Sequence, residues 1–126
     1  MEKIIAVALG GAIGSLGRYF IALVAGEYHT QTFPVGTFLA NLIGCLCIGI
    51  LWSFFDRVTI SNEFRLFLFT GFLGGFTTFS TFARETVQMF KAGEHLQAFT
   101  YLAFSNLFGL GMVAIGFLLV HRFIRW

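Results

Sequence analysis

Four long apolar runs dominate this chain of 126 residues. Residues 4–25 contain Arg18 as their only charged side chain, and residues 35–55, 66–83 and 98–120 contain none. An α-helix rises 1.5 Å per residue, so about 20 apolar residues cross the roughly 30 Å of hydrocarbon in a bilayer. The sequence therefore predicts an all-α integral membrane protein with four transmembrane helices.

The composition fits a membrane protein with a single domain. Hydrophobic residues make up 57% of the chain and charged residues 11%, whereas a typical soluble domain has about a quarter charged residues. Pro34 is the single proline and no polar low-complexity tract offers a linker, so we expect residues 1–126 to form one domain. The net charge of +2 lacks the clustered basic face that nucleic acid requires, and no pair of nucleophile and base stands out. We expect neither a nucleic-acid-binding protein nor an enzyme.

Lysine and arginine residues outside the runs give a weak orientation signal. The first group is Lys3, Arg57, Arg65, Arg122 and Arg125, and the second is Arg84 and Lys91, to which we assign Arg18. A bias of five against three permits a fixed orientation with both chain ends in the cytoplasm, and it permits insertion in both orientations. Two opposite insertions of one sequence would allow an antiparallel, dual-topology homodimer.

The third run contains an unusual concentration of poor helix formers, which predicts a broken helix at membrane depth. Carbonyl groups released by such a break are tolerated in the protein interior or beside water, where they often bind a hard monovalent cation. A simple kink, satisfied by neighbouring hydroxyl groups, is the alternative. The stretch reads TGFLGGFTTFST and includes Gly71, Gly74, Gly75, Thr77, Thr78, Ser80 and Thr81.

Two phenylalanines follow the expected break. Phe79 and Phe82 are three residues apart and so lie on one side of a resumed helix. The edge of an aromatic ring carries partial positive charge, and a pair of edges can contact a small anion without trapping it. Because the chain has 18 phenylalanines, ordinary packing or lipid contact is the competing interpretation.

Polar stripes also run along the second and fourth apolar runs. Asn41 lies at four-residue spacing from Thr37 and Cys45, and Tyr101 and Ser105 lie at the same spacing in the fourth run. An amide left unpaired in hydrocarbon costs several kcal/mol. These stripes therefore predict either hydrogen bonds between helices or the lining of a polar pathway.

Arg18 continues a stripe of small residues in the first run. Ala6, Gly10 and Gly14 precede it at four-residue spacing, a pattern typical of closely packed helices in lipid. Arg18 either extends its head group toward water or acts as a vestibule cation that attracts anions.

Three motifs resemble those of the bacterial fluoride channels of the CrcB/Fluc family: GGAIGSLGRY from residue 10, GTFLANLIG from residue 36 and TGFLGGFTTFSTF from residue 70. The similarity covers the whole chain, and the third motif is the most specific. The resemblance implies an antiparallel homodimer with two pores in a bacterial inner membrane. It also implies passive export of fluoride from the cytoplasm, which lowers fluoride toxicity.

The resemblance also implies roles for particular residues. The break after Leu73 would hold a central structural sodium ion through the backbone carbonyls of Gly74 and Thr77 from both subunits. Arg18 would be the vestibule cation, whereas Gly109 departs from a position that bears a hydroxyl in some members. Fluoride is strongly hydrated, so a selective pore must replace its water with donors and ring edges. The implied pore residues are Asn41, Phe79, Ser80, Thr81, Phe82, Tyr101 and Ser105.

Two other functions remain to be weighed. A small proton-coupled multidrug exporter needs an acid inside the membrane, and all six acidic residues lie outside the four runs. In particular, we expect Glu85 at the water boundary, just past the third run. The other alternative is a structural or assembly subunit with no transport activity of its own.

Overall fold

The computed structural model describes residues 1–28 and 33–124, so Arg125 of the charge count lies outside the described residues. Within them the chain is helical and contains no strand. The segment η1 has the wider turns of a π-helix. The elements are α1 (Glu2–Tyr28), α2 (Val35–Phe55), α3 (Asn62–Arg65), η1 (Leu66–Leu73), α4 (Gly74–Phe76), α5 (Phe79–Lys91) and α6 (His95–Phe123).

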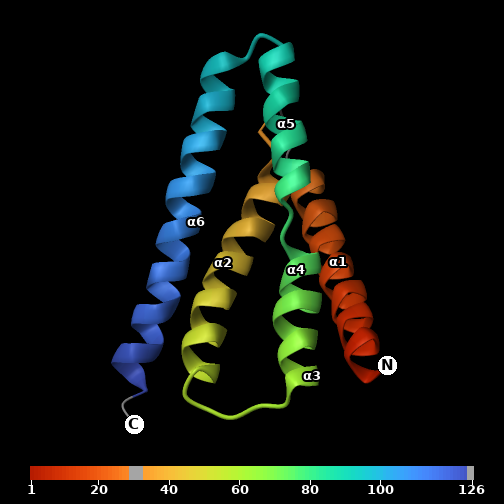
Figure 1. The fold of residues 1–126 in the computed structure, drawn as a ribbon. Coiled ribbons are helices and arrows are strands. Elements are labelled where there is room, and N and C mark those ends of the chain that lie inside the picture. The colour runs from red at the N-terminus through yellow and green to blue at the C-terminus, as the bar shows by residue number, and fades with distance from the viewer. Residues whose placement is uncertain (29–32, 125–126) are drawn as a thin grey trace.

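Four segments are long and apolar enough to cross a membrane, which confirms the expected number of spans. They are Glu2–Gly26, Val35–Phe55, Asn62–Lys91 and His95–Phe123. The third combines α3, η1, α4 and α5. The beginning of α1 and the end of α6 lie at the same end of the bundle (Figure 1).

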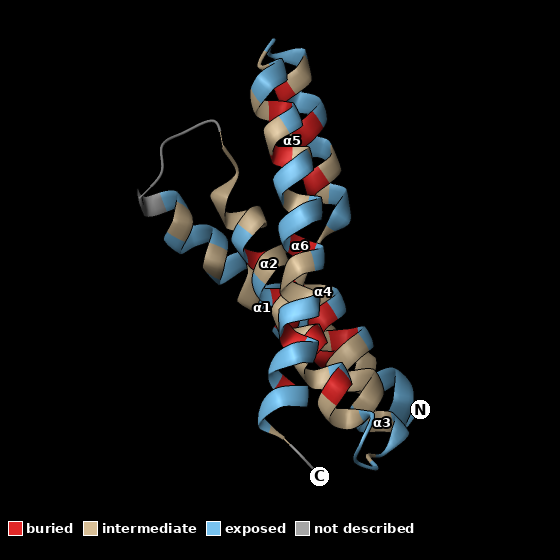
Figure 2. Cartoon of the chain, turned by 90° about the vertical axis from the view of Figure 1, so that its left-hand side faces the viewer, coloured by how far each residue is buried: buried red, intermediate tan, exposed pale blue. Residues whose placement is uncertain are grey.

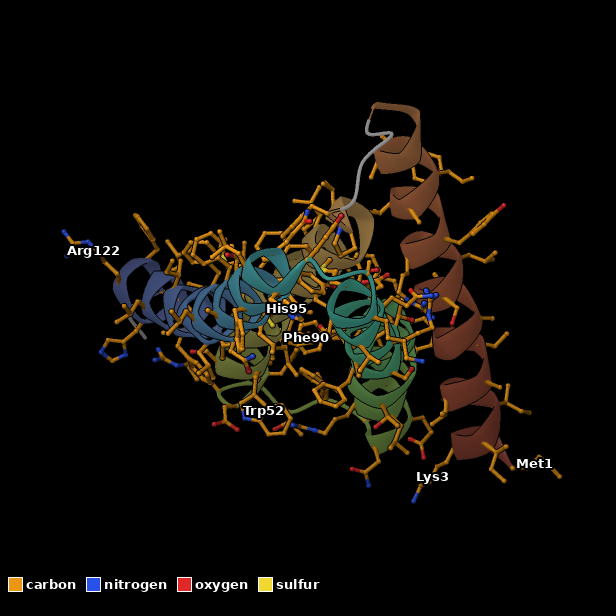
Figure 3. The ribbon with its side chains drawn as sticks, turned by 90° about the horizontal axis from the view of Figure 1, so that it is seen from above. Met1, Lys3, Trp52, Phe90, His95 and Arg122 are labelled. Atoms are coloured by element: carbon orange, nitrogen blue, oxygen red, sulfur yellow. The ribbon has the colours of Figure 1, made fainter. Side chains whose placement is uncertain are left out.

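The bundle consists of two closely packed pairs. α2 makes its most extensive contacts with α6, and α1 makes its most extensive contacts with η1. Seen from above, α1 and α6 occupy opposite sides, with Lys3 and Arg122 far apart in that view (Figure 3). The hairpin of α5 and α6 extends beyond the neighbouring ends of α1 and α2 (Figure 1).

Glycine permits the close approach within each pair. A Cβ atom added to Gly14 of α1 would clash with the Phe72 carbonyl oxygen and lie 2.9 Å from the Phe76 nitrogen. On the other side of the bundle, a Cβ at Gly116 of α6 would lie 2.6 Å from the backbone nitrogen of Ile50 in α2. Contacts this short exclude any side chain, so the stripe of small residues in α1 serves helix packing.

The turn between α5 and α6 is closed by Gly93, whose φ of +79° falls in the left-handed region. The Gly93 N–H donates to the Phe90 carbonyl, and the Glu94 N–H donates to the Met89 carbonyl. This pair of bonds is the Schellman arrangement, which satisfies the last carbonyl groups of a helix. It ends α5 and reverses the chain into α6.

Buried residues follow the inner faces of the helices, and the outer faces are largely exposed (Figure 2). A compact cluster joins Phe82 and Met89 of α5 to Ala98 and Tyr101 of α6. Most large apolar side chains of α1 are exposed in the isolated chain. Such surfaces suit contact with lipid or with another protein chain inside the membrane.

Candidate functional site

The helical path of the third span is interrupted at Thr77 and Thr78. α4 ends at Phe76 and α5 begins at Phe79, and both threonines have extended backbone, with ψ of 156° and 118°. The interruption lies within the stretch of poor helix formers, but later than the position after Leu73 that the resemblance implies. The reason is that the Thr77 N–H and hydroxyl both donate to the Leu73 carbonyl, at 3.0 and 2.9 Å, which keeps Gly74–Phe76 helical.

Asn41 of α2 holds the interrupted backbone. Its Nδ2 donates to the Thr78 carbonyl at 3.0 Å, and its Oδ1 accepts from the Thr78 N–H at 2.8 Å. The Thr78 hydroxyl in turn accepts from the Thr81 N–H at 3.3 Å and donates to the Thr81 hydroxyl at 3.0 Å. Asn41 therefore satisfies the chain where the helix stops, and Thr78 caps the helix that resumes.

These bonds redirect two helical N–H groups. In an unbroken α-helix the N–H of Thr78 would donate to the Gly74 carbonyl, and the N–H of Thr81 to the Thr77 carbonyl. Here they donate to Asn41 and to the Thr78 hydroxyl instead. The carbonyl oxygens of Gly74 and Thr77 thus lose their usual donors and retain capacity for another partner.

Those oxygens fit the hard-cation chemistry of the implied sodium site, because carbonyl groups released from a helix at membrane depth are typical ligands of such ions. Among the described residues, no cluster of His, Cys, Asp or Glu could hold a metal ion. Gly74 is exposed and Thr77 is half-buried, so another chain could reach both. The residues present are therefore compatible with a shared ion.

Arg18 lies at the same interruption. Its Nε donates to the Gly75 carbonyl at 3.1 Å, across the contact between α1 and α4, and the side chain is half-buried. The arginine thus donates a hydrogen bond to the backbone of the third span, just before its interruption. This contact is compatible with either interpretation of its charge.

A cavity of about 380 Å³ opens beside the interruption, lined by residues of α2, α5 and α6 and by residues of η1 and α4. It brings together Asn41, Phe79, Phe82 and Ser105 from three helices. No charged side chain lines it among the described residues. Four of the seven implied pore residues therefore share one cavity, and Gly74 and Thr77 lie at its wall.

The two phenylalanines differ in their surroundings. Their ring centroids are 5.7 Å apart with the planes at 51°, but Phe79 is 79% exposed and Phe82 only 7% exposed. Phe82 packs on Tyr101 with centroids 5.0 Å apart. Phe82 is thus held in place by its packing against Tyr101, whereas Phe79 projects outward from the isolated chain.

The other implied pore residues lie outside this cavity. Ser80 is exposed and Thr81 is engaged with Thr78. Tyr101 is fully buried, and its hydroxyl donates to Glu85 Oε2 at 2.8 Å. Its proton is therefore already used within the chain.

Glu85 is the residue whose position the sequence does not predict. It accepts from the Tyr101 hydroxyl and, through Oε1, from the Thr37 hydroxyl at 2.8 Å, and its side chain is only 15% exposed. Arg84 Nη2 lies 3.9 Å from the same Oε1. The sequence places Glu85 just past the third apolar run; in the structure α5 continues to Lys91, and Glu85 lies between α2 and α6. The sequence held one signal for this position: Thr37 and Tyr101 belong to the polar stripes of the second and fourth apolar runs, and such stripes need polar partners.

Glu85 also borders two smaller cavities, of about 220 and 200 Å³. Thr37 lines the first and Gln88 lines the second. Since Tyr101 contacts both Glu85 and Phe82, a continuous series of side chains links these cavities to the larger one.

A family model described as "CrcB-like protein, Camphor Resistance (CrcB)" matches residues 5–117. The chain belongs to this CrcB-like family. A relative from Desulfotalea psychrophila is 61% identical over 121 residues, which cover 96% of this chain and 94% of the relative. A relative from Chloroflexus aurantiacus is 47% identical over 92% of this chain and 93% of the relative. A relative from Phocaeicola vulgatus is 40% identical over 92% of this chain and 96% of the relative. All three are named "Fluoride-specific ion channel FluC".

Proposed function

We propose that this protein is a fluoride-selective ion channel that lets fluoride leave the cytoplasm passively, and not an enzyme. The observation that carries the proposal is the cavity beside the interrupted third span, where an amide, a hydroxyl and two aromatic rings converge. The names of its relatives support the same ion. Export of this kind would lower fluoride toxicity in a bacterial cell.

The chemistry of the cavity suits a small, strongly hydrated anion. Asn41 and Ser105 can donate hydrogen bonds, and Phe79 and Phe82 can offer polarised ring edges in place of water. Neither lysine nor arginine lines the cavity among the described residues. Each contact is therefore weak enough to release the ion, as conduction requires.

We propose that two copies form an antiparallel homodimer with two pores. Phe79 projects from the isolated chain, and Gly74, Ser80 and Asn106 are exposed at membrane depth. Polar groups facing hydrocarbon are costly, so protein or water should cover this surface. The weak positive-inside bias supports opposite orientations in a bacterial inner membrane. The remaining apolar surface would face lipid.

A structural sodium ion, not transported, would suit the centre of such a dimer. Gly74 and Thr77 of each copy would contribute carbonyl oxygens that have lost their helical donors. Bound there, the cation would offset the partial negative charge of these carbonyl groups. Its role would be to stabilise the assembly.

One observation favours a second candidate, the proton-coupled exporter. Glu85 belongs to the segment Asn62–Lys91, which is long and apolar enough to span a membrane, and its side chain is largely buried, so it is a candidate for the acid that such a mechanism needs. Both of its oxygens accept hydrogen bonds from neighbouring helices, however, which suits a fixed structural carboxylate. The channel remains the better supported function.

Liposomes containing only the purified protein test the proposal. We expect them to lose fluoride rapidly, and to retain chloride, once a cation ionophore prevents the build-up of a membrane potential. Protein-free liposomes supply the control. Equal efflux of the two anions would reject a fluoride-selective channel, and no efflux of either would favour a structural subunit.

A further inference from the structure

We propose that Asn106 of α6 is a further ion-contacting residue of this pathway, which donates an amide N–H to the passing anion. The proposal rests on the proposed function. Asn106 lines the cavity of about 380 Å³ together with Ser105, its neighbour in the sequence. Asn41 and Phe79 line the same cavity from α2 and α5.

The amide of Asn106 is held in place and retains a donor. Its Nδ2 donates one hydrogen to the Leu102 carbonyl, one turn earlier in α6, at 2.8 Å. An amide nitrogen carries two hydrogens, and among the described residues no other partner takes the second. The side chain is therefore oriented by its own helix, with one N–H available to the cavity.

The position of Asn106 also argues for a polar neighbour. It lies near the middle of the 29-residue helix α6 and is exposed in the isolated chain. Hydrocarbon would offer no partner to this amide. A cavity that carries a hydrated anion would offer one, and so would a hydrogen bond to a second copy. The experiment below separates these two partners.

Apart from Ser105 and Asn106, no described polar side chain of α6 lines the cavity. Gly109, one turn later, is buried, and a Cβ there would lie 3.5 Å from the Cys45 sulfur. Tyr101, one turn earlier, donates its hydroxyl proton to Glu85. Ser105 and Asn106 are thus the donors that α6 offers to this cavity among the described residues.

Two substitutions in the full chain test the proposal. Asn106→Leu removes the amide, and Asn106→Asp keeps its shape but replaces the N–H donor with a charged oxygen. Fluoride efflux from liposomes is measured per dimer recovered by size-exclusion chromatography. Because a hydrogen bond to a charged group is among the stronger ones, we expect both variants to lower fluoride efflux about tenfold or more with the dimer intact.

Thr100→Val is the matched control. The Thr100 hydroxyl also donates to a carbonyl of its own helix, that of Leu96 at 2.8 Å, but Thr100 does not line the cavity. We expect its efflux to stay within about twofold of the wild type.

Wild-type efflux per dimer in Asn106→Asp would overturn the proposal. Loss of the dimer in both variants would also overturn it, because Asn106 would then be an interface residue. Absence of fluoride efflux from the wild-type protein would instead reject the proposed function itself.

Discussion

Asn41 of α2 and Thr78, which lies between α4 and α5, are joined by a pair of hydrogen bonds between the amide of Asn41 and the backbone of Thr78. The bond from the Thr78 N–H to the Asn41 amide oxygen replaces the helical bond that this N–H lacks at the interruption. Asn41 also lines the cavity of about 380 Å³. One side chain thus links the helix break to the cavity beside it.

Asn41→Leu should destabilise the protein and abolish most fluoride flux. It leaves the Thr78 N–H without its partner, at a cost of about 1–3 kcal/mol. It also removes one donor from the Thr78 carbonyl, which as an N-cap carbonyl still accepts the first bond of α5. Denaturation of the detergent-solubilised protein measures the loss. Cys47→Ala, on the same helix and away from the cavity, is the control and should cost less. An Asn41→Leu protein with unchanged stability would contradict the role assigned to this pair.

Phe79→Ile and Phe82→Ile should each reduce fluoride flux strongly, because isoleucine keeps the apolar bulk but lacks the polarised ring edge. Their stabilities should differ. Phe79 is largely exposed in the isolated chain, whereas Phe82 is buried against Tyr101 and its replacement should cost about 1–3 kcal/mol. Flux is normalised to the dimer recovered.

Phe54→Ile and Phe117→Ile lie outside the motif and supply the controls for the aromatic pair, with flux expected near the wild-type value. Unchanged flux in both Phe79→Ile and Phe82→Ile would mean that the rings do not carry the ion.

Tyr101→Phe should cost about 1.5–3 kcal/mol, since it removes a hydrogen bond to the carboxylate of Glu85. The same substitution should cost less in a Glu85→Gln background, because the charged acceptor is already gone. A double-mutant cycle of unfolding free energies measures this coupling. Additive costs would indicate that the bond contributes nothing. Tyr19→Phe, at an exposed position of α1, should be neutral.

Gly14→Ala should destabilise the pair of α1 and η1 by about 1–3 kcal/mol, because the added methyl group meets the backbone of Phe72 and Phe76. Gly111→Ala is the matched substitution, since nothing lies within 4 Å of a Cβ at that position. It should be neutral or slightly stabilising, as alanine favours the helix. Equal effects of the two substitutions on thermal stability would argue against tight packing at Gly14.

The spans could be predicted because bilayer thickness fixes the length of an apolar run. Residues 35–55 coincide with α2, and the first and fourth runs fall inside the longer helices α1 and α6. The third run falls inside the segment Asn62–Lys91, which contains the interruption. The site of the interruption could not be placed as well. The low helix propensity of Gly74 and Gly75 marks the region, but the bonds of Leu73 with Thr77 and of Asn41 with Thr78 decide where the helix stops.

The candidate site was predicted in part for a similar reason. The three-residue spacing predicted that Phe79 lies beside Phe82, and the family motifs pointed to Asn41 and Ser105 as pore residues. The structure has the two rings in contact, and all four residues line one cavity. The position of Glu85 depends on partners from other helices, Thr37 and Tyr101, which local sequence patterns do not place together. Contacts between distant segments are therefore where the sequence prediction fell short.

The most direct test of the central claim is the reversal potential of the purified protein in a planar bilayer with a fluoride gradient. A passive, fluoride-selective channel predicts current that reverses at the fluoride equilibrium potential. That potential should not change when a chloride, sodium or proton gradient is added. A reversal potential that follows chloride would contradict selectivity, and one that shifts with the pH gradient would replace the channel with a proton-coupled transporter acting through Glu85.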